Sequence, residues 1–106
     1  MKKIFTLFTV LLLAVTASQA QTGYTKPFVS PNPAHDYIKV NWLMPQANNV
    51  TIAMYYSNGM LAKTLTNHVY GEGPYSEIFK LAIPRGAYFV KIMIGTQIWS
   101  YKLLVQ

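Results

Sequence analysis

The stretch SPNPAHDYIKV, from Ser30 to Val40, decides how this chain begins to fold. Proline cannot donate a backbone hydrogen bond, so regular strand pairing must stop between Pro31 and Pro33. Apolar and polar residues alternate directly afterwards, which puts Ile38 and Val40 on the same side of an extended chain. The stretch therefore predicts a polar turn that leads into a strand with one buried face.

The same alternation recurs further along and predicts short strands separated by turn residues. We expect strands at about residues 36–43, 50–57, 75–81, 87–94 and 97–105, and one more after Asn58-Gly59. The side chains expected in the core are Ile38, Val40 and Trp42; Val50, Ile52, Met54 and Tyr56; Tyr88, Val90, Ile92 and Ile94; and Trp99. Six strands result, or seven if residues 23–29 pair, and no amphipathic helix follows Gln21. The pattern is typical of a small antiparallel β-sandwich.

Asn58-Gly59 predicts a hairpin, because both residues tolerate the positive φ of a type I′ turn. A two-residue loop pairs Tyr56 with Leu61 and brings Lys63 opposite Met54 on an apolar face. Such a lysine would have to lie near an edge and reach water. A three-residue loop with a bulge is the alternative.

Two other turns enclose the most apolar strand, residues 87–94. Pro84 presets φ in the turn before it, and Gly86 is expected to adopt a positive φ. A two-residue turn at Gly95-Thr96 follows the strand. The cross-strand pairs expected from this turn are Lys91 with Ser100 and Phe89 with Lys102, on the face turned away from Tyr88 and Val90.

Residues 1–20 have the features of a cleavable signal peptide. Lys2 and Lys3 precede an apolar run of 12 residues, and Ser18-Gln19-Ala20 is a small-x-small cleavage signal. The run is shorter than the roughly 17–25 residues of a membrane-spanning helix, which disfavours the alternative of a retained anchor. We expect cleavage between Ala20 and Gln21, a short tail over residues 21–27, a sandwich over residues 28–106 and no transmembrane segment after processing.

Charge and cysteine content narrow the classes of function. The seven basic residues beyond the signal peptide outnumber three acidic ones but lie singly along the predicted strands, so no nucleic-acid partner is expected. They suit a solvated outer face or weak attraction to an anionic cell surface. The chain has no cysteine, so the secreted domain must depend on packing without disulfides.

Residues with catalytic potential are scarce, and neither an enzyme, a metal site nor a cofactor is expected. The carboxylates of Asp36, Glu72 and Glu77 have no acid–base spacing, and His35 and His68 stand alone. We expect His35 to close the turn before the first confident strand.

The tyrosines leave two interpretations open. Tyr55, Tyr70 and Tyr75 would suit an exposed platform for sugar rings. Alternatively, they pack their rings across the sheet and keep their hydroxyls in water.

Four marks in the sequence, taken in order, resemble the type A C-terminal sorting domain of the type IX secretion system of Bacteroidetes. The marks are Pro31-Asn32-Pro33-Ala34, the strand from Ile52 to Gly59, the block from Leu81 through Pro84, Gly86, Tyr88 and Val90, and Lys102-Leu103-Leu104-Val105. The resemblance covers residues 28–106. It points to sorting-motif residues at Pro31, Asn32, Pro33, Gly59, Pro84, Gly86, Tyr88, Val90, Lys102, Leu103 and Val105.

This resemblance implies an Ig-like sandwich that serves as an address and not as an enzyme. It implies passage through the periplasm, recognition by the outer-membrane translocon, and removal by a sortase-like cysteine protease at the surface. The cargo would then be released or joined to lipopolysaccharide. Here only residues 21–27 separate the expected cleavage site from the domain, where the family usually carries its cargo. The alternative function is a small secreted carbohydrate-binding or adhesion module.

The signal-peptide prediction is tested by the mass of the exported protein. Because Ser18-Gln19-Ala20 suits signal peptidase, intact-mass measurement should find a chain that starts at Gln21, either free or cyclised to pyroglutamate. An exported species that still carries residues 4–15 would favour the anchor.

Overall fold

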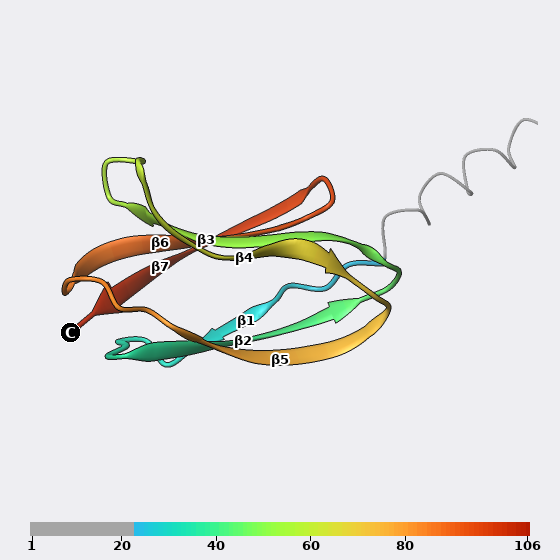
Figure 1. Ribbon diagram of the computed structural model, residues 1–106, viewed down its shortest axis with the longest axis horizontal. Helices are drawn as coiled ribbons and strands as arrows, with labels where there is room; N and C mark the ends of the chain where they lie inside the picture. The colour runs from blue at the N-terminus through green and yellow to red at the C-terminus, as the bar shows by residue number, and fades with distance from the viewer. Residues whose placement is uncertain (1–22) are drawn as a thin grey trace, which may run out of the picture.

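The computed structural model describes residues 23–106, and the predicted signal peptide with its cleavage site at Ala20 and Gln21 lies outside the described residues. The described chain folds into two facing sheets (Figure 1). Its seven strands are β1 (Phe28–Ser30), β2 (Tyr37–Met44), β3 (Asn48–Tyr56), β4 (Leu61–Tyr70), β5 (Gly73–Lys80), β6 (Gly86–Ile94) and β7 (Gln97–Val105).

Every strand pairs with its sheet neighbours in antiparallel fashion. One sheet has the order β1-β2-β5 and the other has the order β4-β3-β6-β7. The predicted all-β, Ig-like sandwich is thus confirmed, and β1 supplies the seventh strand. Within residues 23–106, no helix is long and apolar enough to cross a membrane.

The core lies between the sheets and follows the predicted alternation. β2 and β6 bury every second residue, as expected for strands with one face against a core. The core side chains are Ala34, Ile38, Val40, Trp42, Met44, Val50, Ile52, Met54, Tyr70, Leu81, Tyr88, Val90, Ile92, Ile94, Leu103 and Val105. Trp99 packs against this core but is only half-buried, and Tyr56 is exposed at the end of β3. Residues 23–106 therefore contain a complete hydrophobic core.

The register of β6 and β7 is the predicted one. Lys91 faces Ser100 and Phe89 faces Lys102, so both lysines lie on the outer face. Gly95 enters the turn with φ +59°, a conformation that glycine adopts without steric cost.

The two-residue loop predicted at Asn58-Gly59 is wrong, and the three-residue alternative is correct. Tyr56 accepts a hydrogen bond from Gly59 N–H and donates one to the carbonyl of Met60, which leaves residues 57–59 in the loop. Gly59 has φ +95°. The third loop residue shifts the pairing, so Leu61 faces Tyr55 and not Tyr56.

Two bulges in β4 restore the apolar side chains to the core. The register shifts at Ala62 and again at Leu65, and both side chains pack against the core. Lys63 does face Met54, as expected, and β4 is an edge strand. The Lys63 ammonium group was expected to lie in water, but its Nζ donates a hydrogen bond to the Leu81 carbonyl at 2.8 Å.

The described part of the predicted tail lies against the sandwich. Pro27 is buried, and its carbonyl accepts a hydrogen bond from the Tyr101 hydroxyl at 2.5 Å. The ammonium group of Lys26 lies 5.6 Å from the centre of the same ring. Burial raises the pKa of Tyr101, which favours the protonated hydroxyl that donates this bond.

The backbone at Gly86 gives a test of the turn before β6. Gly86 has φ +154°, which confirms the predicted positive φ, and an added Cβ would meet the Tyr88 ring at an ordinary 3.7 Å. The cost of Gly86→Val therefore comes from the backbone, and we expect a loss of roughly 1–3 kcal/mol in the free energy of unfolding. Urea denaturation measures it. Ala87→Val, at the next and exposed position, is the control, and equal stability of the two variants would contradict the argument.

Candidate functional site

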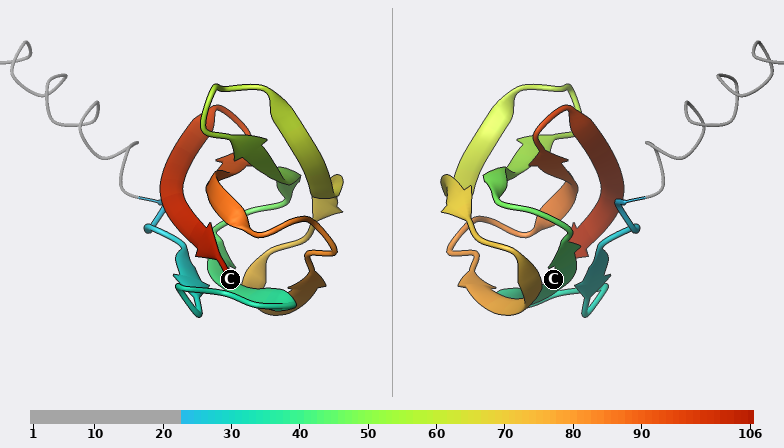
Figure 2. Two further views of the ribbon diagram at one scale, coloured as in Figure 1. Left: turned by 90° about the vertical axis from the view of Figure 1, so that its left-hand side faces the viewer. Right: turned by 90° about the vertical axis from the view of Figure 1, so that its right-hand side faces the viewer.

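Most of the predicted motif residues meet at one end of the sandwich, here called the motif end. It consists of the loops over residues 31–36, 57–60 and 81–85 and the carboxyl end of β7. The registers bring these segments together, because Tyr56 faces Tyr88 and Gly86 faces Val105. In Figure 1 the motif end is on the left, and the left panel of Figure 2 looks onto it.

Asn32 binds the last strand through both atoms of its side-chain amide. Its Nδ2 donates to the Lys102 carbonyl at 2.9 Å, and its Oδ1 accepts from the Leu104 N–H at 3.0 Å. This amide replaces a backbone partner, because the two groups it binds lie on the outer edge of β7. The flanking residues Pro31 and Pro33 have no backbone N–H to donate, so the side chain of Asn32 makes these bonds.

Ala34 continues the same contact with its backbone. Its N–H donates to the Leu104 carbonyl, and its carbonyl accepts from the Gln106 N–H, both at 2.8 Å. Ala34 thereby forms a parallel bridge to Val105. We call this joint contact of residues 32–34 with the carboxyl end of β7 the clamp.

His35 extends the clamp. Its Nδ1 lies 3.1 Å from the Gln106 carbonyl, so it contacts the end of the chain beyond β7. The expectation that His35 closes the turn before β2 is therefore wrong, since its ring binds a segment 71 residues away.

Tyr88 fixes the turn that leads into β6. The buried ring donates its hydroxyl hydrogen to the Pro84 carbonyl four residues earlier, at 2.5 Å. This arrangement is similar to the tyrosine corner of β-sandwiches, in which a tyrosine bonds backbone a few residues upstream. Pro84, Gly86 and Tyr88 thus act together to set the direction of β6 as it leaves the motif end.

The predicted motif residues separate into a buried frame and an exposed surface, except for Gly86, which is partly buried. Tyr88, Val90, Leu103 and Val105 are each at most 4% exposed. The exposed members are Pro31, Asn32, Pro33, Gly59, Pro84 and Lys102. Only the second group is accessible to a partner in the folded state. Val90 lies deeper along β6 than the others and does not contribute to the motif end itself.

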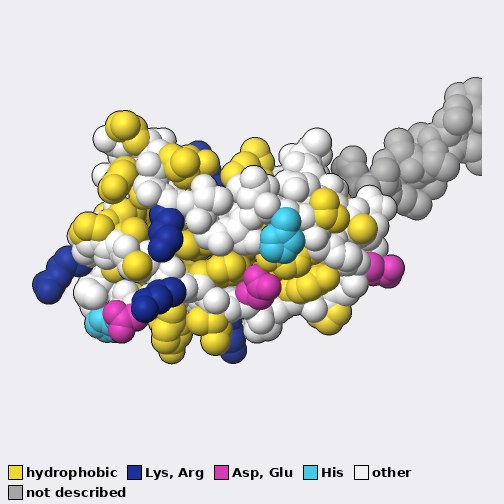
Figure 3. Space-filling model, viewed as in Figure 1, with side chains coloured by type: hydrophobic (Ala, Val, Ile, Leu, Met, Phe, Trp, Pro, Cys, Tyr) yellow, Lys and Arg dark blue, Asp and Glu magenta, His cyan; other side chains and the backbone are white. Residues whose placement is uncertain are grey.

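Exposed apolar and basic side chains accompany the motif residues at this end. Met60 and Leu61 are 65% and 54% exposed on the β3–β4 hairpin, and Leu104 is 42% exposed on β7. Arg85 and Lys102 are exposed nearby. Figure 3 shows hydrophobic and basic side chains together toward the left of the molecule.

The Lys63 contact with Leu81 was not anticipated from the sequence. It joins β4 to the loop before β6, where Ala82 has φ +48°. A non-glycine residue with positive φ is uncommon, and no glycine or asparagine marks this position. The sequence feature that could have indicated this contact is Lys63 itself, a charged residue on the apolar face of a predicted strand.

The tyrosine platform predicted as one alternative is absent. Tyr55 lies on β3 opposite Phe89, and Lys91 lies over its ring at 4.5 Å. Tyr75 stacks on Trp42 with centroids 5.2 Å apart, and the buried Tyr70 meets both rings edge to face. The rings therefore pack on one another and do not form a common exposed face.

The Tyr70 hydroxyl is not in water, contrary to the second interpretation. It donates to Glu77 Oε1 at 2.9 Å and lies 3.0 Å from the Thr66 hydroxyl. Burial is the main reason that the pKa of Tyr70 is raised, and Glu77 raises it further while Thr66 opposes the change. His68 stacks on the same ring at 4.3 Å.

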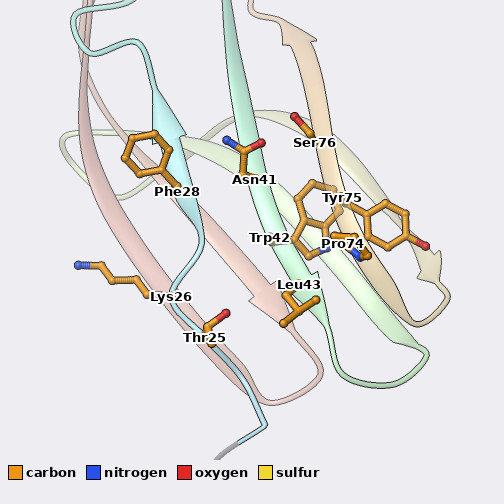
Figure 4. A pocket seen from close by; sticks show the side chains of 9 residues that line it. All are labelled: Thr25, Lys26, Phe28, Asn41, Trp42, Leu43, Pro74, Tyr75 and Ser76. Atoms are coloured by element: carbon orange, nitrogen blue, oxygen red, sulfur yellow. The ribbon is translucent and has the colours of Figure 1, made fainter.

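An open hollow lies on the outer face of the three-stranded sheet, toward the end opposite the motif end. Figure 4 shows Phe28 on β1, Asn41 and Leu43 on β2, and Tyr75 and Ser76 on β5 around it. No acid–base pair lines the hollow. Within residues 23–106, no group of three histidine, cysteine, aspartate or glutamate side chains can hold a metal ion.

Comparison with known families gives one match. The family model for the secretion system C-terminal sorting domain matches residues 29–106. No curated protein and no solved structure matches the chain significantly. The matched region extends from β1 past the end of β7, so it contains both partners of the clamp.

The clamp can be tested at Asn32. Asn32→Ala removes two hydrogen bonds, and we expect the free energy of unfolding to fall by roughly 1–3 kcal/mol. Hydrogen exchange at the Leu104 amide should accelerate more than exchange in β3. Asn67→Ala is a matched control, because this exposed asparagine binds only the side chains of Asn49 and Thr51. Unchanged Leu104 exchange in Asn32→Ala would contradict the role of the amide.

Proposed function

The chain belongs to the family of type IX secretion C-terminal sorting domains, and from this premise we propose that its motif end is the surface read by the outer-membrane translocon. Membership assigns the chain a sorting-signal role in export toward the cell surface or the extracellular space. The proposal concerns which part of the fold carries the signal.

The observation that carries the proposal is the clamp. The two ends of the matched region are far apart in sequence, yet Asn32 and Ala34 hold residues 102–106 through hydrogen bonds of 2.8–3.0 Å. A receptor that contacts the motif end would therefore read both ends of the domain at once. An incomplete or unfolded domain does not present this composite surface.

The division into frame and surface gives most of the motif residues a role. We assign a structural role to Tyr88, Val90, Leu103 and Val105, because a partner cannot reach them. Lys102 and the loop of Pro31, Asn32 and Pro33 are the accessible part. Exposed apolar side chains beside two cations suit a receptor surface that is apolar with an acidic rim.

The remaining partners and steps are proposed on family membership. We propose that the precursor crosses the periplasm after removal of residues 1–20, engages the translocon and is delivered to the surface or the medium. A sortase-like protease would act on it there. In this account the domain is an address and catalyses no reaction, in agreement with the general character of the family.

The alternative is a secreted carbohydrate-binding or adhesion module. The aromatic platform that would have favoured it is absent, and its remaining candidate location is the hollow beside Phe28 and Tyr75 (Figure 4). Glycan-array binding that is lost on Phe28→Ala would support this alternative.

The experiment joins a signal peptide, a reporter and residues 21–106, expressed in a Bacteroidetes host with and without a working translocon. Reporter should reach the surface or the medium only in the competent host. Lys102→Glu should reduce delivery severalfold, because it reverses the charge at an exposed motif position without removing a core contact.

Lys39→Glu is the matched control, since Lys39 is an exposed strand lysine on the other sheet. Circular dichroism and melting of the purified fusions separate lost recognition from unfolding. A folded fusion that stays in the periplasm of the competent host would overturn the sorting proposal. Equal delivery of the two lysine variants would overturn the assignment of the motif end.

A further inference from the structure

The two sheets have four outer edges, and within residues 23–106 three of them carry a feature that hinders edge pairing. β1 is only three residues long, β4 is interrupted by two bulges, and the clamp covers the carboxyl end of β7. Short strands, bulges and covering segments are the devices by which proteins prevent edge pairing. β5 differs, because its eight residues pair with β2 without a register shift and no strand follows it in the sheet.

The direction of the free backbone groups of β5 follows from its ladder with β2. The Leu81 N–H donates to the Asp36 carbonyl, which continues the register of the pair. Because the direction alternates along an antiparallel strand, Phe79, Glu77 and Tyr75 also turn their backbone groups toward β2. Ser76, Ile78 and Lys80 must then point theirs away from the sheet.

At both ends of this open edge, fewer backbone groups are able to bind an added strand. Pro74 has no N–H to offer, and the Lys80 carbonyl already lies 3.5 Å from Lys63 Nζ. The unused groups are therefore the N–H and carbonyl of Ser76 and Ile78, the carbonyl of Pro74 and the N–H of Lys80. A segment of about seven extended residues would span them.

The side chains along the edge define what such a segment must carry. On the outer face, Ile78 is 64% exposed and lines a hollow with Asp36, Tyr37 and Lys80. On the inner face, the Glu77 carboxylate lies near the seam between β4 and β5, held by Tyr70. Figure 3 looks onto this seam, where an acidic and a histidine side chain lie among hydrophobic ones.

We propose that the free edge of β5 is a second interaction site, which binds an extended peptide by antiparallel strand addition. The residue of that peptide opposite Glu77 is basic, because like charges directly opposite are unfavourable and opposite charges attract. The residue opposite Ile78 is apolar. A second copy of this chain is a poor occupant, since antiparallel pairing of the unused groups of residues 74–80 about their midpoint sets Glu77 against Glu77.

The site adjoins the motif end at Asp36, but it extends along β5, which is on the other sheet from β7 and its part of the clamp. When a peptide adds to a sheet edge, main-chain hydrogen bonds provide the affinity and alternate side chains provide the selectivity. A short sequence pattern in the peptide is therefore sufficient for recognition. The edge would thus let a folded domain hold a basic, extended segment of another polypeptide without covering Lys102 on β7.

The test uses the blocked peptide acetyl-TVVRTVT-amide and residues 21–106 labelled with nitrogen-15. In the antiparallel register its arginine faces Glu77 and its second valine in sequence faces Ile78. Titration at millimolar peptide should shift the amide resonances of Ser76, Ile78 and Lys80 most. Acetyl-TVVETVT-amide should bind about fivefold more weakly.

Two controls remove hydrogen bonds without changing side-chain recognition. Ser76→Pro deletes an N–H that points away from β2 and should weaken binding about fivefold or more, whereas Ser76→Thr should bind as the parent does. A peptide N-methylated at its third and fifth residues tests the same bonds with the unaltered protein. Shifts confined to other residues, equal binding of the arginine and glutamate peptides, or equal binding of the N-methylated peptide would each overturn the proposal.

Discussion

The clamp is the contact on which the rest of this structure depends. A strand at the edge of a sheet leaves half of its backbone groups without partners, and β7 is such a strand. Asn32 and Ala34 supply those partners over the last residues of β7. The contact also covers the core at this end, where Ala34, Leu103 and Val105 are buried. One short loop therefore both protects an edge and closes the sandwich.

The absence of cysteine gives this closure more weight. A small secreted domain often gains stability from disulfides, which constrain its unfolded chain. Here the long-range constraint comes from hydrogen bonds between segments about 70 residues apart. Such bonds are cooperative with the packing beneath them, because the Asn32 amide is correctly placed only when Leu103 and Val105 are in the core. If the motif end is the surface read by the translocon, as we propose, its recognition is linked to completion of the fold.

The sequence predicted the features that depend on local pattern. Alternation in β2 and β6 identified their buried faces, and the turn at Gly95-Thr96 correctly fixed the register of β6 and β7. It was only partly right at β4. Lys63 faces Met54 as expected, but alternation cannot reveal where a bulge interrupts the period, and Ala62 and Leu65 each add one residue. The clamp was not foreseen either. Asn32 looks like a turn residue by sequence, and its partners on β7 are known only once the sheets have been packed.

The topology also determines when the domain can form during synthesis. β7 is translated last among the strands, yet it completes the larger sheet beside β6 and receives the clamp from residues 32–34. Until it leaves the ribosome, β6 is an apolar edge and the loop at Asn32 has nothing to bind. Chains usually fold from the N-terminus as they emerge, but here non-local pairing postpones closure to the end. Within residues 23–106, the order of the strands therefore makes closure of the larger sheet one of the last events of synthesis.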